Sequence, residues 1–314
     1  TYRNALTFTY NNLSVKVTVE ISDAEVTITG RTAHTLTFTG KGGVTYQVQK
    51  SDEAGGSLTG NVMSAATAAG TGKGTADGLD KAAYYLISHK AYGQAVGRTS
   101  LVDAKDIAKQ FEDRGAGDTT GNNATDRTEK AENSNVQVVV DDDGNYKVIV
   151  KKDIDRTVEI PDTWGEVKID LGGHTITGDK ADDNHAAKPG LDFVKDGSIN
   201  EHPGTKLEIV NGTIKGGDGS AKHPDGAPGI GASGDTADAG LIIGNDAKVI
   251  GGNGADGTEG KDGGNGGAGI DGNGKITPAV NGTVTGGNGG KGGDSATGIP
   301  GNGGNGGTGI SAGD

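Results

Sequence analysis

Residues 1–60 alternate apolar and polar positions with a period of two, which is the pattern of half-buried β-strands. The alternating stretches are rich in Val, Thr, Ile and Phe, and Gly or Asn residues separate them. Several short strands at this spacing are typical of a β-sandwich. We therefore expect a β-sandwich module over residues 1–75, with strands at Ala5–Tyr10, Leu13–Ile21, Glu25–Thr29, Thr35–Thr39 and Val44–Val48.

Two later segments, Leu79–Tyr92 and Ser100–Arg114, favour helices. Apolar residues recur at helical spacing in the second segment, and Ser100 followed by Asp103 forms a variant capping box at its start. The stretch behind it is polar and poor in apolar residues, which is typical of a linker. The sequence thus predicts a helical pair and a polar linker over residues 76–135.

Strand signals return at Val136 and then recur with a long period. Glycine pairs that follow a strand begin at Gly216, Gly251 and Gly286, in steps of 35, and a Gly-Ile pair recurs in steps of 40. Periods between about 20 and 50 residues are typical of solenoids, whose coils bury apolar residues against each other. We expect a solenoid over residues 136–314. Its predicted core residues are Ile209, Ile214, Leu241, Ile243, Val249, Ile276, Val280 and Val284.

The chain contains 61 glycines, and 37 of them lie in residues 211–314, mainly in inserts between the predicted strands. Glycine permits close approach of backbones. We expect the inserts to stack from coil to coil as polyproline-II-like segments bonded through their backbones. Flexible loops and a ligand-binding loop face are the alternatives. Collagen is excluded, because glycine does not occupy every third position and the chain has 7 prolines.

Two phrases resemble known families. Ile21–Gly30 (ISDAEVTITG) resembles the junction between tandem β-sandwich repeats of the MBG/YDG-like type in Gram-positive bacterial surface proteins. Lys168–Gly178 (KIDLGGHTITG) is similar to a phrase that opens many right-handed parallel β-helices of the pectate-lyase-like superfamily, with Gly172 in place of the usual Asn. The resemblances imply an extracellular spacer repeat and a mainly β chain that ends in a right-handed parallel β-helix. Neither implies an activity.

Composition restricts the partners. The net charge of −13 argues against nucleic acid, whose phosphates require Lys and Arg, and against an anionic membrane surface. No apolar run has the roughly 18 residues of a transmembrane helix. The chain has no cysteine, which together with the resemblances favours an extracellular protein of the bacterial cell wall. Since the sequence starts in a strand pattern and stops inside a repeat, we expect a monomeric piece of a longer polypeptide.

Candidate binding chemistry lies in acidic loops and in the glycine-rich inserts. The run Gly251–Glu259 is similar to a calcium-binding nonapeptide, with Asp256 at the acidic position. Calcium is also a candidate ligand of the acidic turn at residues 141–143. No cofactor is expected to be required. The candidate ligand-binding residues are Asp179, Asp182, Asp183, His185, Asp218, His223, Asp225, Asn253, Asp256, Asn265 and Asn288.

Histidines add a second kind of candidate site. If the coils align, His185 and His223 approach Asp183 and Asp225, a combination that suits a metal or general acid–base chemistry. The compact metalloprotease motif H-E-x-x-H is absent from the sequence.

No catalytic residue is predicted. The sequence has no Gly-x-Ser-x-Gly elbow and no cysteine nucleophile. The main hypothesis is a non-catalytic surface adhesin that presents a β-helix face to a host glycan or a host protein such as mucin or immunoglobulin. The alternatives are a carbohydrate-active β-helix enzyme or an accessory region of a secreted hydrolase or protease, and a stalk without a ligand. A carboxylate cluster on an exposed sheet would favour the enzyme.

Overall fold

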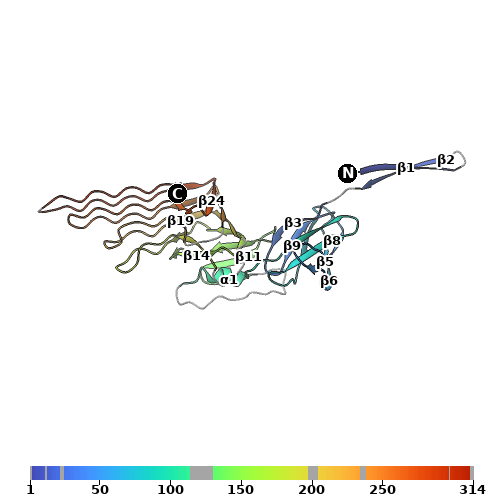
Figure 1. Ribbon diagram of the computed structural model, residues 1–314, viewed down its shortest axis with the longest axis horizontal. Helices are drawn as coiled ribbons and strands as arrows, with labels where there is room; N and C mark the ends of the chain where they lie inside the picture. Colours follow the sequence, from blue (N-terminus) through green and yellow to red (C-terminus); the bar gives the residue numbers. More distant parts are fainter. Residues whose placement is uncertain are drawn as a thin grey trace. The chain divides into compact units, whose positions relative to one another are not determined.

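The computed structural model describes residues 2–10, 13–21, 25–113, 130–196, 204–233, 238–296 and 298–311 of the 314-residue chain. These residues are mainly β-structure, with a single short helix among them (Figure 1). The chain divides into two compact units, residues 1–100 and 101–314. None of the helical structure in the described ranges is long and apolar enough to span a membrane.

The first unit consists of antiparallel sheets. A hairpin pairs β1 (Tyr2–Tyr10) with β2 (Leu13–Ile21). A three-stranded sheet has the order β3 (Thr27–Arg31), β4 (Leu36–Thr39), β7 (Lys73–Ala76). A four-stranded sheet has the order β6 (Thr59–Ala66), β5 (Thr45–Ser51), β8 (Tyr84–His89), β9 (Gly93–Arg98). The last two sheets share one core, in which the rings of Phe38 and Tyr46 meet edge to face at 5.3 Å.

The helix predicted over Leu79–Tyr92 is wrong, because this segment contains β8 and its turn. Tyr84–Ile87 is a short run of aromatic and branched residues, and such a run fits a strand as well as a helix. Pairing decides between them, since β8 lies between β5 and β9 and buries the Ile87 side chain completely.

The second predicted helix exists only as α1 (Ala104–Lys109). Its N-cap is Asp103 rather than Ser100, and the backbone N–H of Asp103 donates to the Asp106 carboxylate at 3.3 Å. Ile107 and Phe111 belong to the same buried core as Trp164 of the solenoid. The predicted helical pair is therefore one short helix that packs onto the second unit.

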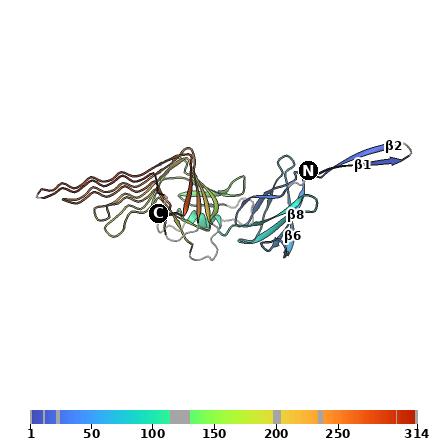
Figure 2. The same ribbon diagram turned by 45° about the horizontal axis from the view of Figure 1, so that its top comes forward.

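The second unit is a β-solenoid in which successive coils each add one strand to three sheets (Figure 2). An antiparallel start leads into the seven-stranded sheet: β10 (Ala131–Glu132), β11 (Val136–Val140), β12 (Tyr146–Val150), β15 (Gly165–Asp170), β18 (Thr205–Val210), β21 (Ala239–Ile243), β24 (Ile276–Val280). One five-stranded parallel sheet comprises β13 (Ile154–Asp155), β16 (Thr175–Thr177), β19 (Gly212–Lys215), β22 (Ala247–Ile250), β25 (Thr283–Thr285). The other comprises β14 (Val158–Pro161), β17 (Leu191–Val194), β20 (Ile230–Ala232), β23 (Ile270–Asp271), β26 (Ile310–Ser311).

The repeat spacings in the sequence are the strand registers of the solenoid. Ile214 pairs with Val249, and Val249 pairs with Val284, in steps of 35 residues. Ile230 and Ile270 begin the corresponding series with steps of 40. The solenoid prediction is confirmed. Of the eight predicted core residues, Ile209, Ile214, Leu241, Ile243, Val249 and Ile276 are buried.

Val280 and Val284 depart from the predicted core. The side chain of Val280 is 38% exposed, and Val284 is only partly buried. Both lie in the last coil of the stack, on which no described strand packs from the outer side.

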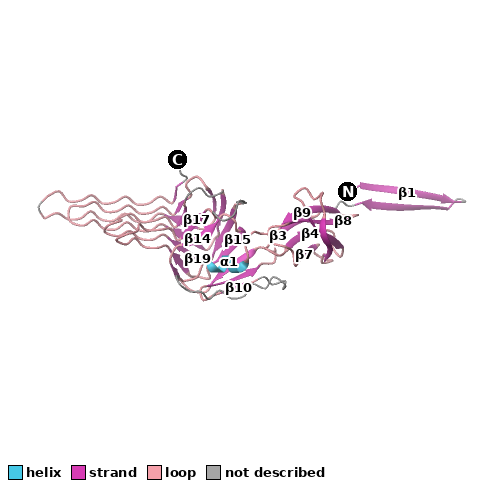
Figure 3. Cartoon of the chain, turned by 60° about the horizontal axis from the view of Figure 1, so that its bottom comes forward, coloured by secondary structure: helices cyan, strands magenta, loops and turns pink. Residues whose placement is uncertain are grey.

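The glycine-rich inserts form arms that project from the coils and stack on one another (Figure 3). We call residues 178–190, 216–229, 251–269 and 286–309 the first, second, third and fourth arm. Each arm has an outgoing half and a returning half, which connect the two five-stranded sheets. The arms lengthen from coil to coil (Figures 1 and 2).

Backbone hydrogen bonds between the arms repeat every third residue. The N–H groups of Gly251, Gly254 and Gly257 donate to carbonyls of the fourth arm's coil at 2.7–2.9 Å. The neighbouring triplet position bonds across the two halves, as where Gly264 donates to Ala255 at 2.8 Å and Gly267 to Gly252 at 2.8 Å. A polyproline II helix has three residues per turn and no internal hydrogen bonds, so each turn offers its groups to neighbours. The expected polyproline-II-like stacking is confirmed.

Glycine is required where the arms touch. A Cβ on Gly264 would overlap the carbonyl oxygen of Pro224 in the preceding arm, and a Cβ on Gly252 would overlap that of Gly217. Both glycines are buried. The interior of the stack is thus backbone against backbone, as at the crowded axis of collagen, and it contains no apolar side chains at these contacts.

Replacing Gly264 by Ala is expected to destabilise the second unit. The added methyl has to displace a backbone carbonyl, and overpacking of this kind costs about 1–3 kcal/mol or more of unfolding free energy. The matched control is Gly306→Ala, since a Cβ there has its nearest neighbour at 3.7 Å. Urea unfolding followed by the fluorescence of Trp164, the single tryptophan of the chain, measures both variants. Equal stability of the two variants would contradict the close-packed stack.

Candidate functional site

Aspartate and asparagine side chains on the outgoing halves of the arms bond to the next layer. The Asp218 carboxylate accepts the backbone N–H of Asn253 at 2.8 Å, and the Asn253 amide oxygen accepts that of Asn288 at 3.0 Å. The Asp256 carboxylate accepts the backbone N–H of Lys291 at 2.7 Å. These side chains therefore satisfy the outward-facing N–H groups of the stack, which the arm-to-arm backbone bonds leave over.

The returning halves carry an equivalent ladder. The Asp225 carboxylate accepts the backbone N–H of Asn265 at 2.7 Å, and the Asn265 amide oxygen accepts that of Asn305 at 2.9 Å. Six candidate residues lie in these ladders, where each has either a donor or an acceptor role between layers: Asp218, Asp225, Asn253, Asp256, Asn265 and Asn288. Their positions give them a structural role as lattice side chains.

The ladder bonds also act on ionisation. Burial raises the pKa of Asp218, but the hydrogen bonds from the Asn253 N–H and the Lys215 ammonium outweigh it, and the pKa lies below its usual value. Lys215 and Asp218 form an ion pair at 2.9 Å. Asp218 is thus held as a carboxylate, the form that accepts the bond from the next layer.

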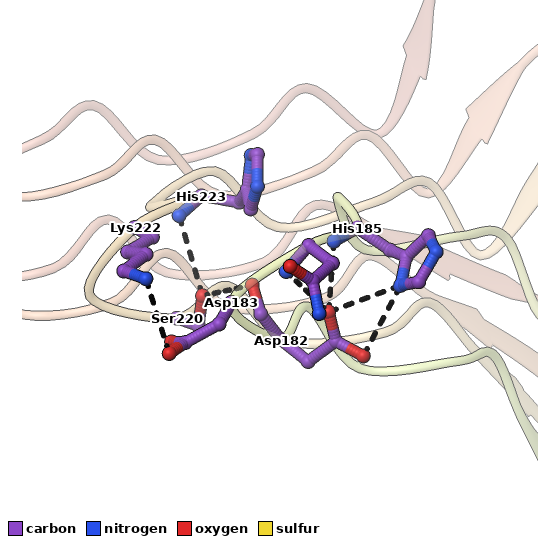
Figure 4. A network of polar contacts seen from close by, with 7 residues as sticks. Asp182, Asp183, His185, Ser220, Lys222 and His223 are labelled. Carbon is purple, nitrogen blue, oxygen red and sulfur yellow. Dashed lines mark hydrogen bonds and ion pairs between the residues drawn. The ribbon is translucent and has the colours of Figure 1, made fainter.

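The remaining acidic candidates lie at or near the tip of the first arm (Figure 4). The Asp182 carboxylate accepts the backbone N–H groups of Asn184 at 2.7 Å and of His185 at 2.8 Å. The bond from Asn184 is the main cause of the lowered pKa of Asp182, and His185 adds to it. Asp179, further down the arm, lines a shallow depression of about 340 Å³ together with Asp182 and His185.

The first and second tips are brought together, as coil alignment requires. The Lys222 ammonium contacts the Asp183 carboxylate at 3.1 Å, and the Ser220 hydroxyl donates to the Asp182 carbonyl oxygen at 3.3 Å. The imidazole of His185 turns toward Asp182, whereas that of His223 does not (Figure 4). Across the described ranges, no group of three or more His, Asp or Glu side chains has the arrangement of a metal site.

The tips of the longer arms carry residues that the sequence analysis overlooked. At the third tip, the Lys261 N–H closes a tight turn onto the Thr258 carbonyl at 2.8 Å. At the fourth tip, the Ile299 side chain is 88% exposed. A large apolar residue that interrupts a long glycine-rich run was the available signal for Ile299, because such a residue has no core to enter.

A charged groove over the seven-stranded sheet was also missed. Its volume is about 530 Å³, and β12, β15, β18, β21 and β24 or their turns contribute to its lining. Glu166 pairs with Lys206, and Glu208 pairs with Lys168, each at 3.0 Å. The signal for this face is the outward position of every second residue in β15 and β18, where charged residues alternate in sign.

Asp192 on β17 is the one described carboxylate whose pKa lies above its usual value. Its side chain belongs to a residue that is 8% exposed, and burial raises the pKa against the hydrogen bond that the Ser233 hydroxyl donates at 2.7 Å. The second carboxylate oxygen, Oδ1, is buried without a hydrogen-bond partner among the described residues. An unpaired buried charge is costly, so ionised Asp192 opposes folding.

The sequence matches no protein-family model, and neither curated proteins nor solved structures provide a match. The class of the molecule therefore follows from its own geometry. The second unit is a β-solenoid with a stack of glycine arms, which carries charged tips at the arm ends and a charged groove on one sheet.

We expect Asp192→Asn to raise the melting temperature at pH 7. A raised pKa in the folded state means that folding favours the protonated acid, so stability falls as the pH rises from the unfolded pKa of about 3.9 through the folded value. The gain should disappear at pH values near the unfolded pKa, where the carboxyl of the parent chain is already protonated. Melting curves at pH 7 and pH 4 measure the difference, with Asp271→Asn on the same sheet as control. A lower melting temperature of Asp192→Asn at pH 7 would contradict the assignment.

Proposed function

We propose that this chain is a non-catalytic adhesin-type binding module of a bacterial surface protein, and that the arm tips carry the recognition. The observation that supports it is the division of labour within the arms. Their interior is glycine backbone and their walls are ladder side chains, whereas charged and large side chains collect at the tips.

Rigid support of short loops is the usual architecture of a recognition surface. Each outgoing and returning half is bonded to its neighbours every third residue, so the arms have the order of a scaffold. The tips are the turns that this scaffold displays. Because the arms differ in length, the tips end at different levels (Figure 3).

The tip chemistry suits a protein or glycoprotein surface. Opposite charges meet at Asp183 and Lys222, His185 is exposed, and Ile299 adds an apolar contact. Hydrogen-bonding and charged groups around an exposed apolar residue are the elements of a protein interface. We propose a host glycan or a host protein such as mucin or immunoglobulin as the ligand class.

The rest of the proposal follows the family resemblances. The antiparallel sheets of the first unit would be a spacer of the immunoglobulin-like, MBG/YDG-like sandwich type, and the solenoid a right-handed β-helix of the pectate-lyase-like kind. The proposed location is the bacterial cell wall, outside the cell. Calcium at the acidic turns remains part of this proposal as a possible ligand, with no role in catalysis.

The groove over the seven-stranded sheet favours a second candidate, a carbohydrate-active β-helix or an accessory region of a secreted hydrolase. Its volume and its charged lining suit an extended polar chain. Against catalysis stands the engagement of its carboxylates. Glu166 and Glu208 form ion pairs with lysines, and the Asp141 carboxylate accepts two backbone N–H groups of its own turn. A glycosidase pair needs one carboxyl that holds a proton and one that is free.

Substitution of tip residues separates these candidates. We expect the triple variant Lys222→Ala/Lys261→Ala/Ile299→Ser to bind purified mucin, immunoglobulin or glycans at least about tenfold more weakly than the parent chain, because anchor side chains dominate interface energies. The groove variant Glu166→Gln/Glu208→Gln should keep its affinity within about twofold. Biolayer interferometry with immobilised ligands measures both.

The reverse pattern of affinities would move the proposal to the groove, and release of oligosaccharides during incubation would make the chain an enzyme. Absence of binding to every ligand class would contradict the adhesin and leave a stalk. Melting curves of all variants confirm that the tips and the groove can be changed without unfolding.

A further inference from the structure

The outer side of the last coil exposes apolar side chains that earlier coils bury. Val280 is 38% exposed and Ile310 is 46% exposed. Their register partners one coil earlier, Ile243 and Ile270, are 0% and 1% exposed. Terminal repeats of soluble solenoids usually present a polar outer side, so this apolar end is unusual for a surface that faces only water.

The same side of the fourth arm retains glycine where the fold of one chain does not need it. A Cβ on Gly303 or Gly306 would have its nearest neighbour at 3.6 or 3.7 Å, an ordinary contact. The equivalent residues 40 positions earlier are Gly263 and Gly266, and a Cβ there would overlap carbonyl oxygens of the next arm. The two exposed glycines are thus shaped for close approach of another backbone.

Backbone polarity leads to the same conclusion. The N–H groups of Gly263 and Gly266 donate to the fourth arm at 2.8 Å, whereas those of Gly303 and Gly306 have no partner in the described part of the chain. Carbonyl groups of the third arm accept bonds from the fourth, as Gly264 accepts from Gly290 at 2.8 Å.

The corresponding carbonyls of the fourth arm, at Gly304 and Gly307, accept no hydrogen bond from any described residue. Donors and acceptors therefore alternate along one exposed half-arm. An edge with donors alone could not pair with itself, but an edge with both can.

We propose that this end face, formed by Val280, Val284, Gly303, Gly306 and Ile310, binds the same face of a second copy of the chain. A twofold axis would place the N–H groups of each copy against the carbonyls of the other, and would bury the apolar strand ends together. Such an isologous contact closes on itself and yields a dimer. The arms within one chain already use this contact between layers. The proposal replaces the monomer expected from the sequence, and it does not depend on the function of the arm tips.

Sedimentation velocity of the full 314-residue chain over a concentration series tests the proposal. The parent chain should form a dimer. The double variant Gly303→Val/Gly306→Val should weaken the dimer at least about tenfold, since its side chains have room in one chain but block the approach of another. Ile310→Asp should weaken it as well, because it places a charge in the apolar contact.

The matched control is Gly70→Val in the first unit, where a Cβ has no neighbour within 4 Å. It should leave the dimer intact, and Trp164 fluorescence reports whether each variant folds. A monomeric parent chain at about 100 µM would overturn the proposal. A dimer that survives both end-face variants would overturn it equally, because the copies would then meet elsewhere.

Discussion

The second unit depends on one contact, the hydrogen bond between glycine backbones in neighbouring arms. It repeats every third residue at about 2.8 Å, and at many of these contacts it leaves no room for a Cβ. A chain with only 31% hydrophobic residues and 4% aromatic residues can build a long projecting structure in this way, because the arms need no apolar core of their own. The apolar residues are reserved for the coils, where Ile209, Ile214 and Val249 form part of a continuous column.

The same contact determines what side chains can do. In a three-residue turn, two positions face neighbouring backbones and the third faces outward. Outward positions are where Asp218, Asn253 and Asn265 lie, and their side-chain oxygens bond the N–H groups that the backbone lattice leaves over. Recognition is therefore best sought where the lattice ends. That is at the tips, on the groove of the seven-stranded sheet, and on the end face of the last coil.

Much of the solenoid could be predicted from the sequence, because the steps of 35 and 40 residues are literally the strand registers. Other features depend on three-dimensional pairing. The run Tyr84–Ile87 became a strand because β5 and β9 flank it. The ladder role of Asp218 and Asn253 was not predictable, since a one-dimensional pattern does not tell which face of a polyproline II turn meets the next coil. Ile299 was overlooked for a simpler reason, because a single apolar residue has no periodicity.

Amide hydrogen exchange measured by NMR tests the ordered stack most directly. The account predicts that the N–H groups of Gly264, Gly267 and Gly290 exchange as slowly as those of solenoid strands such as β18, because each is buried and bonded to a neighbouring arm. Exchange of these glycines at the rate of an unstructured chain, while β18 stays protected, would contradict the account and make the arms flexible loops on an ordinary solenoid.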